Sequence, residues 1–218
     1  MNKIHNIGFI NKRNEPLDSL DDFPTPPWVT RALMEMIKKR NIFTDNCSVL
    51  EPAANRGYIS NTLREYDDFQ SMTCSDIFDY GLKGCEKVDF LSNHYASNSY
   101  DWVITNPPFN HAESFILRAF DVSRKGLAIF SRSNLLEGQS RYNNIYKDKR
   151  PSYHFQFSER VSLFKGRVSK KTASATAFSW FVWSFDNVSC ETITDWIPPC
   201  KLRLEKESDY DERIKNVR

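Results

Sequence analysis

Compact hydrophobic stretches alternate with amphipathic segments along the first 130 residues of the chain. Val29, Leu33, Met36 and Ile37 recur at helical spacing, and the same period appears at 59–66 and 112–120. The intervening apolar stretches predict strands at 47–51, 71–77, 88–90, 100–105 and 126–130. Strands that alternate with helices in this way predict a doubly wound α/β fold with a mostly parallel sheet.

After residue 131 the pattern changes, and with it the predicted organisation. Residues 134–149 predict a polar helix, 153–171 have few periodic signals, and 176–185 form an aromatic-rich strand pattern. From residue 201 the charges are evenly mixed, which predicts a solvated helix or a frayed end. We therefore expect a loose arm (1–21), a single domain (22–200) with an insert at 131–172 that faces the substrate, and a charged tail (201–218).

Composition adds three expectations. Of the 218 residues 40% are hydrophobic and 27% charged, as in soluble globular proteins, and a net charge of +2 neither demands nor excludes a nucleic-acid partner. No apolar run reaches the ~20 residues of a membrane span and no signal peptide begins the chain, so a cytoplasmic protein is expected. The five cysteines form no Cys-x-x-Cys pair, which predicts reduced thiols and no metal site.

The chemistry is concentrated in Asn106-Pro107-Pro108-Phe109, which directly follows the apolar strand 100–105. That strand delivers Asn106 to the carboxyl edge of the sheet, where open α/β folds bind ligands. An amine conjugated to an aromatic ring is a poor nucleophile. The Asn106 and Pro107 carbonyls would grip its hydrogens and stabilise the positive charge that develops on methylation, while Phe109 offers a stacking face. An ordinary Asn-Pro turn is the alternative interpretation.

Other candidates follow earlier strands. Glu51-Pro-Ala53-Ala-Asn55-Arg-Gly57 lies between a strand and a helix, where a cofactor loop belongs, and Glu51 would hold an ammonium group or a bound water. Asp76, followed by Ile77, ends the next strand and would accept ribose hydroxyls, with Asp79 as a rival. Asp89-Phe90 would hold an adenine. A plain turn and a solvated acidic loop are the alternatives. Before the first predicted helix, Thr25 would be the capping residue and Pro26 the first helical residue.

Together these motifs resemble the gamma-type amino methyltransferases, the family of DNA adenine N6-methyltransferases. The order matches over residues 22–186: Thr25-Pro-Pro, Glu51-Pro-Ala-Ala…Gly57, Asp89-Phe90 and Asn106-Pro-Pro-Phe109. The segments 135–142 and 180–183 resemble small phage-borne members. One departure is Asn55, where the family loop usually carries glycine; asparagine tolerates the left-handed conformation.

The resemblance implies a Rossmann-like fold with an antiparallel C-terminal hairpin and S-adenosylmethionine as cofactor. It implies that Thr25, Pro26 and Trp28 line the methionine end of the cofactor, that Glu51, Ala53, Asn55 and Gly57 form the loop, that Asp76 and Ile77 take the ribose, and that Asp89 and Phe90 take the adenine. Residues 106–109 would be catalytic, with Asn106 also touching the cofactor.

A base inside a duplex cannot reach a recessed site, so the expected partner is single-stranded DNA or a duplex with the base flipped out. The basic residues expected to bind it are Arg132, Arg141, Arg160, Lys165, Arg167, Lys170 and Lys171. A solvated basic loop is the alternative. Because only about forty residues (131–171) are spare for recognition, short or relaxed sequence specificity is expected. The histidines suggest no metal ligands, and His111 reads best as a helix-start residue rather than a substrate contact.

Two rival functions remain open at this point. The same motif would serve an enzyme acting on an amine of RNA adenine or guanine, or on a protein glutamine. Glutamine enzymes usually carry tyrosine at the position of Phe109. The other rival is a catalytically silent nucleic-acid-binding protein of the same fold. Self-protection, restriction-modification, phage evasion of host restriction and regulation are all compatible biological roles, and the sequence leaves the oligomeric state open.

Overall fold

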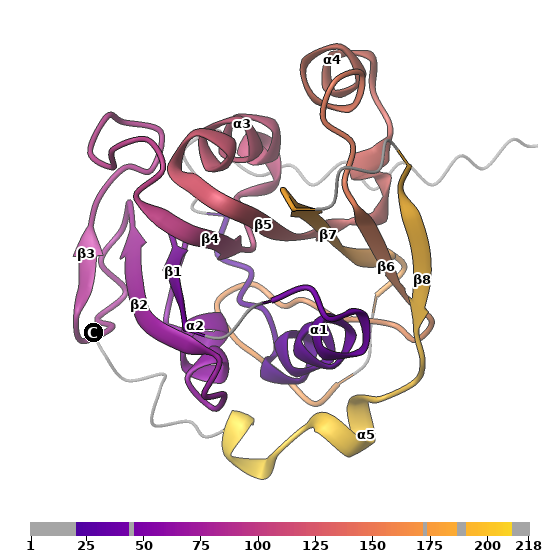
Figure 1. Ribbon diagram of the computed structural model, residues 1–218. Helices are drawn as coiled ribbons and strands as arrows, with labels where there is room; N and C mark the ends of the chain where they lie inside the picture. Colours follow the sequence, from indigo (N-terminus) through magenta and orange to yellow (C-terminus); the bar gives the residue numbers. More distant parts are fainter. Residues whose placement is uncertain (1–20, 44–45, 172–173, 187–190, 211–218) are drawn as a thin grey trace, which may run out of the picture.

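A single sheet organises the chain (Figure 1) in the computed structural model, which describes residues 21–43, 46–171, 174–186 and 191–210. The described strands run in the order β3-β2-β1-β4-β5-β7-β6-β8. They are β1 (Cys47–Glu51), β2 (Phe69–Asp76), β3 (Cys85–Lys87), β4 (Tyr100–Thr105), β5 (Ser123–Arg132), β6 (Tyr153–Phe157), β7 (Phe178–Ser184) and β8 (Ile193–Ile197).

The pairing directions confirm the predicted mostly parallel sheet with an antiparallel C-terminal hairpin. Strand β1 pairs in parallel with β2 and β4, and β2–β3, β4–β5 and β6–β8 are parallel as well. Only β7 runs against its neighbours β5 and β6. The chain reverses its strand order between β1 and β4, and the carboxyl ends of parallel strands at such a switch point are where α/β folds bind ligands.

Helices cover both faces of the sheet (Figure 1), because neighbouring residues of each central strand point to opposite sides. Val49, Trp102 and Ala128 belong to one buried cluster, which α1 (Pro27–Arg40) and α2 (Tyr58–Leu63) cover. The next residue of each strand belongs to a second cluster under α3 (Ala112–Val122). Helix α1 begins one residue later than predicted: Pro26 is the cap residue, and no side chain caps the helix.

Within residues 133–157, two segments differ from the sequence-based expectation. Residues 134–149 are not one helix but the short turns η2 (Ser133–Leu136), α4 (Gln139–Arg141) and η3 (Tyr142–Tyr146), interrupted at Gly138, whose φ is 113°. The segment from 153 contains strand β6, where little periodicity was visible. Tyr153, Phe155 and Phe157 do alternate with His154 and Gln156, but a run of five residues is too short to distinguish a strand from a loop by periodicity.

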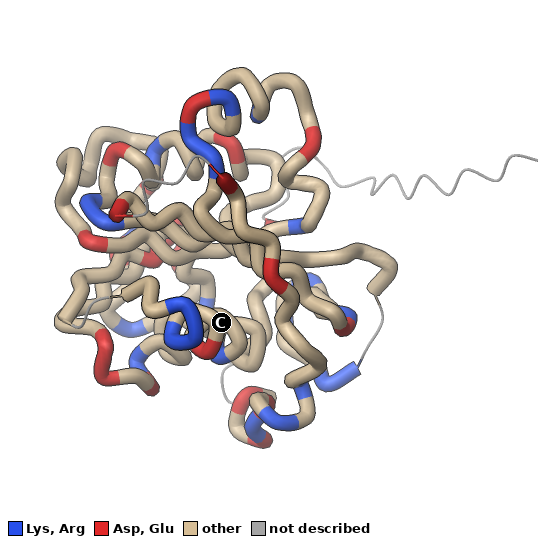
Figure 2. Tube along the Cα trace, turned by 45° about the vertical axis from the view of Figure 1, so that its right-hand side comes forward, with Lys and Arg blue, Asp and Glu red and all other residues tan. Residues whose placement is uncertain are grey.

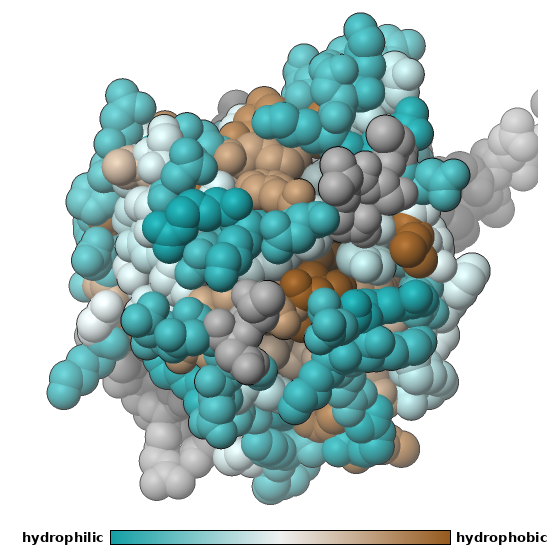
Figure 3. Space-filling model, in the orientation of Figure 1, coloured by the Kyte–Doolittle hydropathy of each residue, from teal (hydrophilic) through white to brown (hydrophobic). Residues whose placement is uncertain are grey.

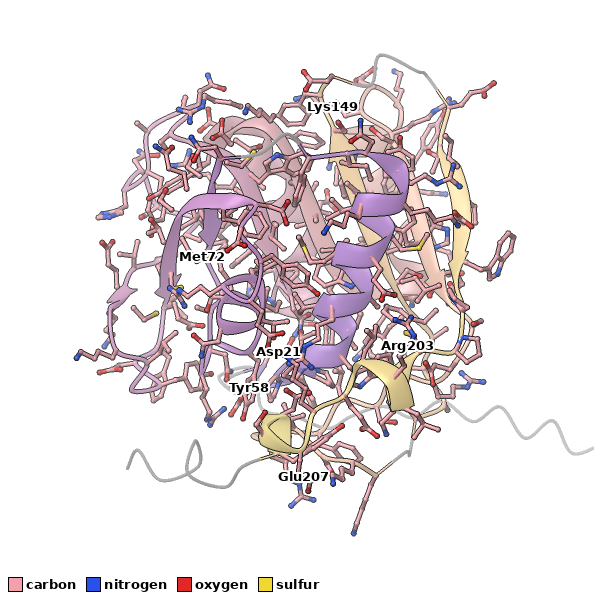
Figure 4. The ribbon with its side chains drawn as sticks, turned by 60° about the horizontal axis from the view of Figure 1, so that its bottom comes forward. Asp21, Tyr58, Met72, Lys149, Arg203 and Glu207 are labelled. Carbon is pink, nitrogen blue, oxygen red and sulfur yellow. The ribbon has the colours of Figure 1, made fainter. Side chains whose placement is uncertain are left out.

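The described part of the tail begins with the predicted helix, none of whose residues is buried, but residues 205–210 are docked, so the expectation of a frayed end is wrong for them. Helix α5 (Lys201–Leu204) and turn η4 (Glu207–Tyr210) lie along α1 and α2 (Figure 4, Arg203 and Glu207). Buried Asp209 pairs with buried Arg31 at 2.7 Å, and Arg31 also binds Glu65 at 2.7 Å. The acidic partners overcome the desolvation of Arg31 and raise its pKa above the ordinary value.

Surface properties fit the composition. Lys and Arg are interspersed with Asp and Glu along the trace (Figure 2), and the face in Figure 3 is mostly hydrophilic. Among the described residues no helix is long and apolar enough to cross a membrane, and no group of three His, Cys, Asp or Glu is placed to hold a metal ion. Cys47, Cys74, Cys85 and Cys200 are free thiols, and Cys190 lies outside the described residues.

Candidate functional site

A cavity of about 440 Å³ opens at the carboxyl ends of β1, β2 and β4. The loops after these strands supply most of its wall, together with the segment that precedes α1. The structure therefore brings together residues that are far apart in sequence. The predicted residues that line the cavity are Thr25, Glu51, Ala53, Asn55, Asp76, Ile77, Asp89, Phe90, Asn106 and Pro108.

Five predicted residues do not line the cavity: Pro26, Trp28, Gly57, Pro107 and Phe109. Trp28 is 2% exposed and packs edge-on against Phe157 in the core, with 5.5 Å between the ring centroids. His111 precedes α3, as predicted for a helix-start residue, and it also lines the cavity. The other lining residues, which the sequence pattern did not single out, are Asp21, Phe23, Pro24, Pro52, Ala54, Tyr58, Ile59, Tyr80, Leu91, Asn110 and Phe115. Adjacency was the available signal, because most of them neighbour a predicted residue.

The loop between β1 and α2 uses two left-handed residues. Asn55 has φ 51° and Gly57 has φ 80°, so the asparagine adopts the left-handed conformation that glycine adopts most readily. The Asn55 side-chain oxygen accepts the Arg56 backbone N–H at 2.8 Å, which stabilises this turn. Gly57 ends the loop as the residue before α2.

Substituting Gly57 by alanine is expected to lower the free energy of unfolding by about 1–2 kcal/mol from backbone strain alone. An added Cβ would also lie 2.8 Å from the Leu82 side chain, which must shift. Gly84→Ala is the matched control, because Gly84 has φ +78° but nothing within 4 Å of its Cβ position. Urea unfolding should show a larger loss for Gly57→Ala; equal losses would mean that Leu82 yields freely.

Two buried carboxylates face the cavity. Glu51 is 1% exposed and accepts the Ser60 N–H at 2.8 Å, and burial raises its pKa to about 8. Asp76 accepts the backbone N–H groups of Asn55 at 2.9 Å and Phe78 at 3.0 Å, and burial raises its pKa as well. Its rival Asp79 does not line the cavity and accepts the Gly81 N–H in an exposed turn. The cavity thus presents carboxyl groups at the ends of β1 and β2.

Asn106 has one paired and one unpaired end. Its amide nitrogen donates to the Phe23 carbonyl at 3.0 Å, which fixes the orientation of the side chain. Its Oδ1 is buried and has no hydrogen-bond partner among the described residues. A buried carbonyl oxygen without a donor costs about 1–3 kcal/mol, so a donor that reaches it binds favourably.

The segment 21–25, here called the strap, ties the loops together. The Asp21 carboxylate accepts the Phe109 N–H at 2.5 Å, and the Asp22 carboxylate accepts from the Asn55 side chain at 2.8 Å and pairs with Arg56 at 2.8 Å. In Figure 4 Asp21 lies near Tyr58, and both line the cavity. The strap therefore connects the loop after β1 with the loop after β4.

Phe109 lies beside the cavity rather than in its wall. Its ring contacts Phe23 and Phe178, with centroid distances of 5.9 and 6.3 Å. The Arg132 guanidinium lies over the ring, 4.4 Å from its centroid. Arg132 ends β5, so the loops after β4 and β5 meet at this ring.

The remaining basic residues do not form one array. Arg141 donates to the Leu135 carbonyl, Arg160 donates to the Ala175 carbonyl, and Lys170 pairs with Glu207 of the docked tail at 2.5 Å. Lys165 and Arg167 flank Gly166, whose N–H binds the Asp22 carbonyl of the strap at 2.8 Å. Lys171 is exposed and follows Lys170. Of this set, Arg132, Lys165 and Arg167 lie nearest the site by these contacts.

Comparison with solved structures identifies the fold as that of class I S-adenosylmethionine-dependent methyltransferases. A Listeria monocytogenes protein assigned to that class superposes with a TM-score of 0.62 at 14% identity, covering 91% of this chain and 72% of its own. A type I restriction-modification methyltransferase subunit from Streptococcus thermophilus gives 0.63 at 9%, covering 90% of this chain, which spans about half (52%) of that subunit.

A Pyrococcus horikoshii protein assigned as an RNA methyltransferase gives a TM-score of 0.51 at 15% identity, covering 73% of this chain and 82% of its own. No protein-family model and no curated protein matches the sequence.

Proposed function

We propose that this chain transfers a methyl group from S-adenosylmethionine to the N6 amine of adenine in DNA. The observation that carries the proposal is the unpaired, buried Oδ1 of Asn106 at the cavity, held in place through the other end of the same amide. An acceptor without a donor, at the carboxyl edge of a methyltransferase fold, is the group that an incoming amine requires.

The cavity fits the cofactor by size and by chemistry. Its volume of about 440 Å³ is in the range of small-molecule sites. Asp76 suits ribose hydroxyls, Phe90 and Asp89 suit the adenine, and Glu51 suits the ammonium group. The Thr25 hydroxyl at the same cavity is buried and has no hydrogen-bond partner within the described part of the chain, and it can bind the cofactor's carboxylate.

The sulfonium-bound methyl group of S-adenosylmethionine is the electrophile. Asn106 Oδ1 would accept a hydrogen bond from an N–H of the target amine, which favours a more tetrahedral nitrogen with an available electron pair. With the cofactor bound, that pair would take up the methyl group, S-adenosylhomocysteine would leave with the electrons of the C–S bond, and the nitrogen would then lose one proton to water. Asn106 stabilises the positive charge that develops on the nitrogen and holds it in line with the methyl group.

The choice of DNA rests on Phe109, on the basic residues and on the likeness to the gamma-type family. The substrate-facing insert supports it: Glu113, in the first turn of α3, binds Ser140 at 2.8 Å and Asn144 at 2.6 Å, so residues 133–149 stand beside the loop 106–111. This small lobe and residues 150–171 are the part of the chain left for sequence recognition. Short or relaxed specificity follows.

The test is transfer of a radiolabelled methyl group to duplex DNA, single-stranded DNA, RNA and a glutamine peptide, followed by nucleoside mass spectrometry. We expect N6-methyladenine in DNA. Label only in RNA or in the peptide would move the function to those substrates, and no label on any of them, with cofactor bound, would make the protein a silent binder. Sequencing of methylated DNA checks specificity; methylation confined to one motif of six or more base pairs would contradict the relaxed reading.

A further inference from the structure

Arg132 covers the ring on which the target base is expected to stack. Its guanidinium lies 4.4 Å from the Phe109 centroid, while Phe23 and Phe178 contact the same ring at tilted angles of 35° and 42°. At that distance no base fits between the guanidinium and the ring. A base can therefore stack on this face only after Arg132 leaves it.

A guanidinium can occupy the same position on an aromatic ring as a base. Both groups are planar, and both bind the face of an aromatic ring. Arg132 also ends β5, at the start of the lobe that stands beside the loop 106–111. A guanidinium that leaves an aromatic face finds its strongest alternative partner in a phosphate, which it binds through two parallel hydrogen bonds.

We propose that Arg132 is a substrate-positioning residue: it holds the face of Phe109 in the free protein and moves to a backbone phosphate beside the target nucleotide when the base stacks. The inference rests on the proposed function, because it takes Phe109 as the base platform. Asn106 Oδ1, on the same loop, is buried in the free protein, which fits an arrangement that opens when substrate enters.

The exchange predicts opposite effects on two ligands. A nucleoside without a phosphate must displace Arg132 from Phe109 and forms no new contact with the guanidinium. In a strand, a backbone phosphate binds the displaced guanidinium, and this contact offsets the lost cation–π contact. In Arg132→Ala, adenosine should therefore bind about two- to fivefold more tightly, the strength of a half-exposed cation–π contact. A short single-stranded oligonucleotide should bind about tenfold more weakly, because one charge-assisted contact is lost.

The experiment measures both dissociation constants by calorimetry, with the cavity saturated by S-adenosylhomocysteine so that adenosine cannot bind there. The salt dependence of oligonucleotide binding is measured as well, and its logarithmic slope should fall by about 0.7 in Arg132→Ala. Arg132→Lys keeps the charge and should keep the slope. Arg203→Ala is the matched control, because this exposed arginine of α5 pairs with Glu35, away from the cavity and the Phe109 ring. Its adenosine affinity should not change.

Each other pattern overturns the inference. Weaker binding of both ligands would mean that Arg132 is a fixed part either of the stacking site or of the fold. A lower melting temperature of Arg132→Ala would indicate the fold, and an unchanged one the stacking site. Unchanged adenosine affinity, or none in either form, would mean that this face of Phe109 does not take a base. Binding is measured without turnover, so the two failures can be told apart. If the adenosine and oligonucleotide affinities change in opposite directions but no methyl group is transferred, only the proposed function is wrong. If methyl groups are transferred but the affinities do not change in this way, only the role of Arg132 is wrong.

Discussion

Asn106→Ala is expected to lower the rate of methyl transfer by about 10²–10³-fold while leaving cofactor affinity within a few-fold of the wild type. The substitution removes the buried Oδ1 that is placed to accept the target amine and, with it, the hydrogen bond to Phe23. Because the acceptor acts most strongly as charge develops on the nitrogen, the loss should appear in kcat rather than in KM. Single-turnover kinetics with labelled cofactor, together with calorimetry, measure the two quantities.

Two variants make this prediction specific. Asn106→Asp keeps an acceptor oxygen but cannot donate to the Phe23 carbonyl, so its activity should fall between wild type and Asn106→Ala. Asn61→Ala changes an exposed asparagine on α2 whose side chain accepts from Arg64, and it should turn over normally. If Asn106→Ala were as active as Asn61→Ala, the assignment of Asn106 as the amine acceptor would be wrong.

The strap determines how Asn106 presents its Oδ1 to the cavity. The Phe23 carbonyl binds one end of the Asn106 amide, and the Asp21 carboxylate holds the Phe109 N–H. The strap thus sets the orientation of the acceptor and the position of the ring at once. Through Asp22 and Arg56 it is joined to the loop after β1 as well. Residues of the same strap line the cavity, so we expect a ligand bound there to contact the segment that also holds the loop 106–109.

The sequence predicts the centre of the fold well because local signals and tertiary structure agree there. Strand β4 has the predicted bounds, Tyr100–Thr105, since all but the first of its residues are buried. The third strand was placed at 88–90, whereas β3 is Cys85–Lys87. Its residues are polar and mostly exposed at the sheet edge, so no hydrophobic pattern revealed them. Phe90, the apolar residue that drew the prediction, lies instead in the cavity wall.

The strap was beyond a reading of local pattern. Asp21 ends the segment expected as a loose arm and Asp22 begins the expected domain, but neither has a local signal for its contacts, because their partners are 33 to 88 residues away. The docking of the tail gave no local signal either, because Asp209 is an acidic residue that is buried where it pairs with the distant Arg31. Asn55 is the opposite case. Its tolerance of a left-handed backbone is a property of the residue itself, and the observed φ of 51° agrees with it.

Glu51→Gln is expected to weaken cofactor binding and to remove its pH dependence. Burial raises the pKa of Glu51 to about 8, so below that pH the free protein holds a neutral carboxyl group. Pairing with the cofactor's ammonium group requires the carboxylate, so binding should tighten as pH rises toward about 8 and release a proton. Calorimetry in buffers of different ionisation enthalpy measures that proton; a pH-independent affinity in the wild type would contradict the pairing.

The same substitution should stabilise the protein without ligand, and the sign follows from the pKa. Between the ordinary value for glutamate and about 8, the native state keeps a proton that the unfolded state has lost, so wild-type stability falls as pH rises through this window. Glutamine has no proton to lose and still accepts from Ser60. The melting temperature of Glu51→Gln should therefore exceed that of the wild type at pH 8 and converge with it near pH 4.

Glu35→Gln is the control with the opposite sign: Arg203 lowers the pKa of Glu35, so losing that exposed pair should slightly lower stability at neutral pH. A Glu51→Gln protein that is less stable than wild type at pH 8 would show that the carboxylate, rather than the acid, is the form that the fold retains.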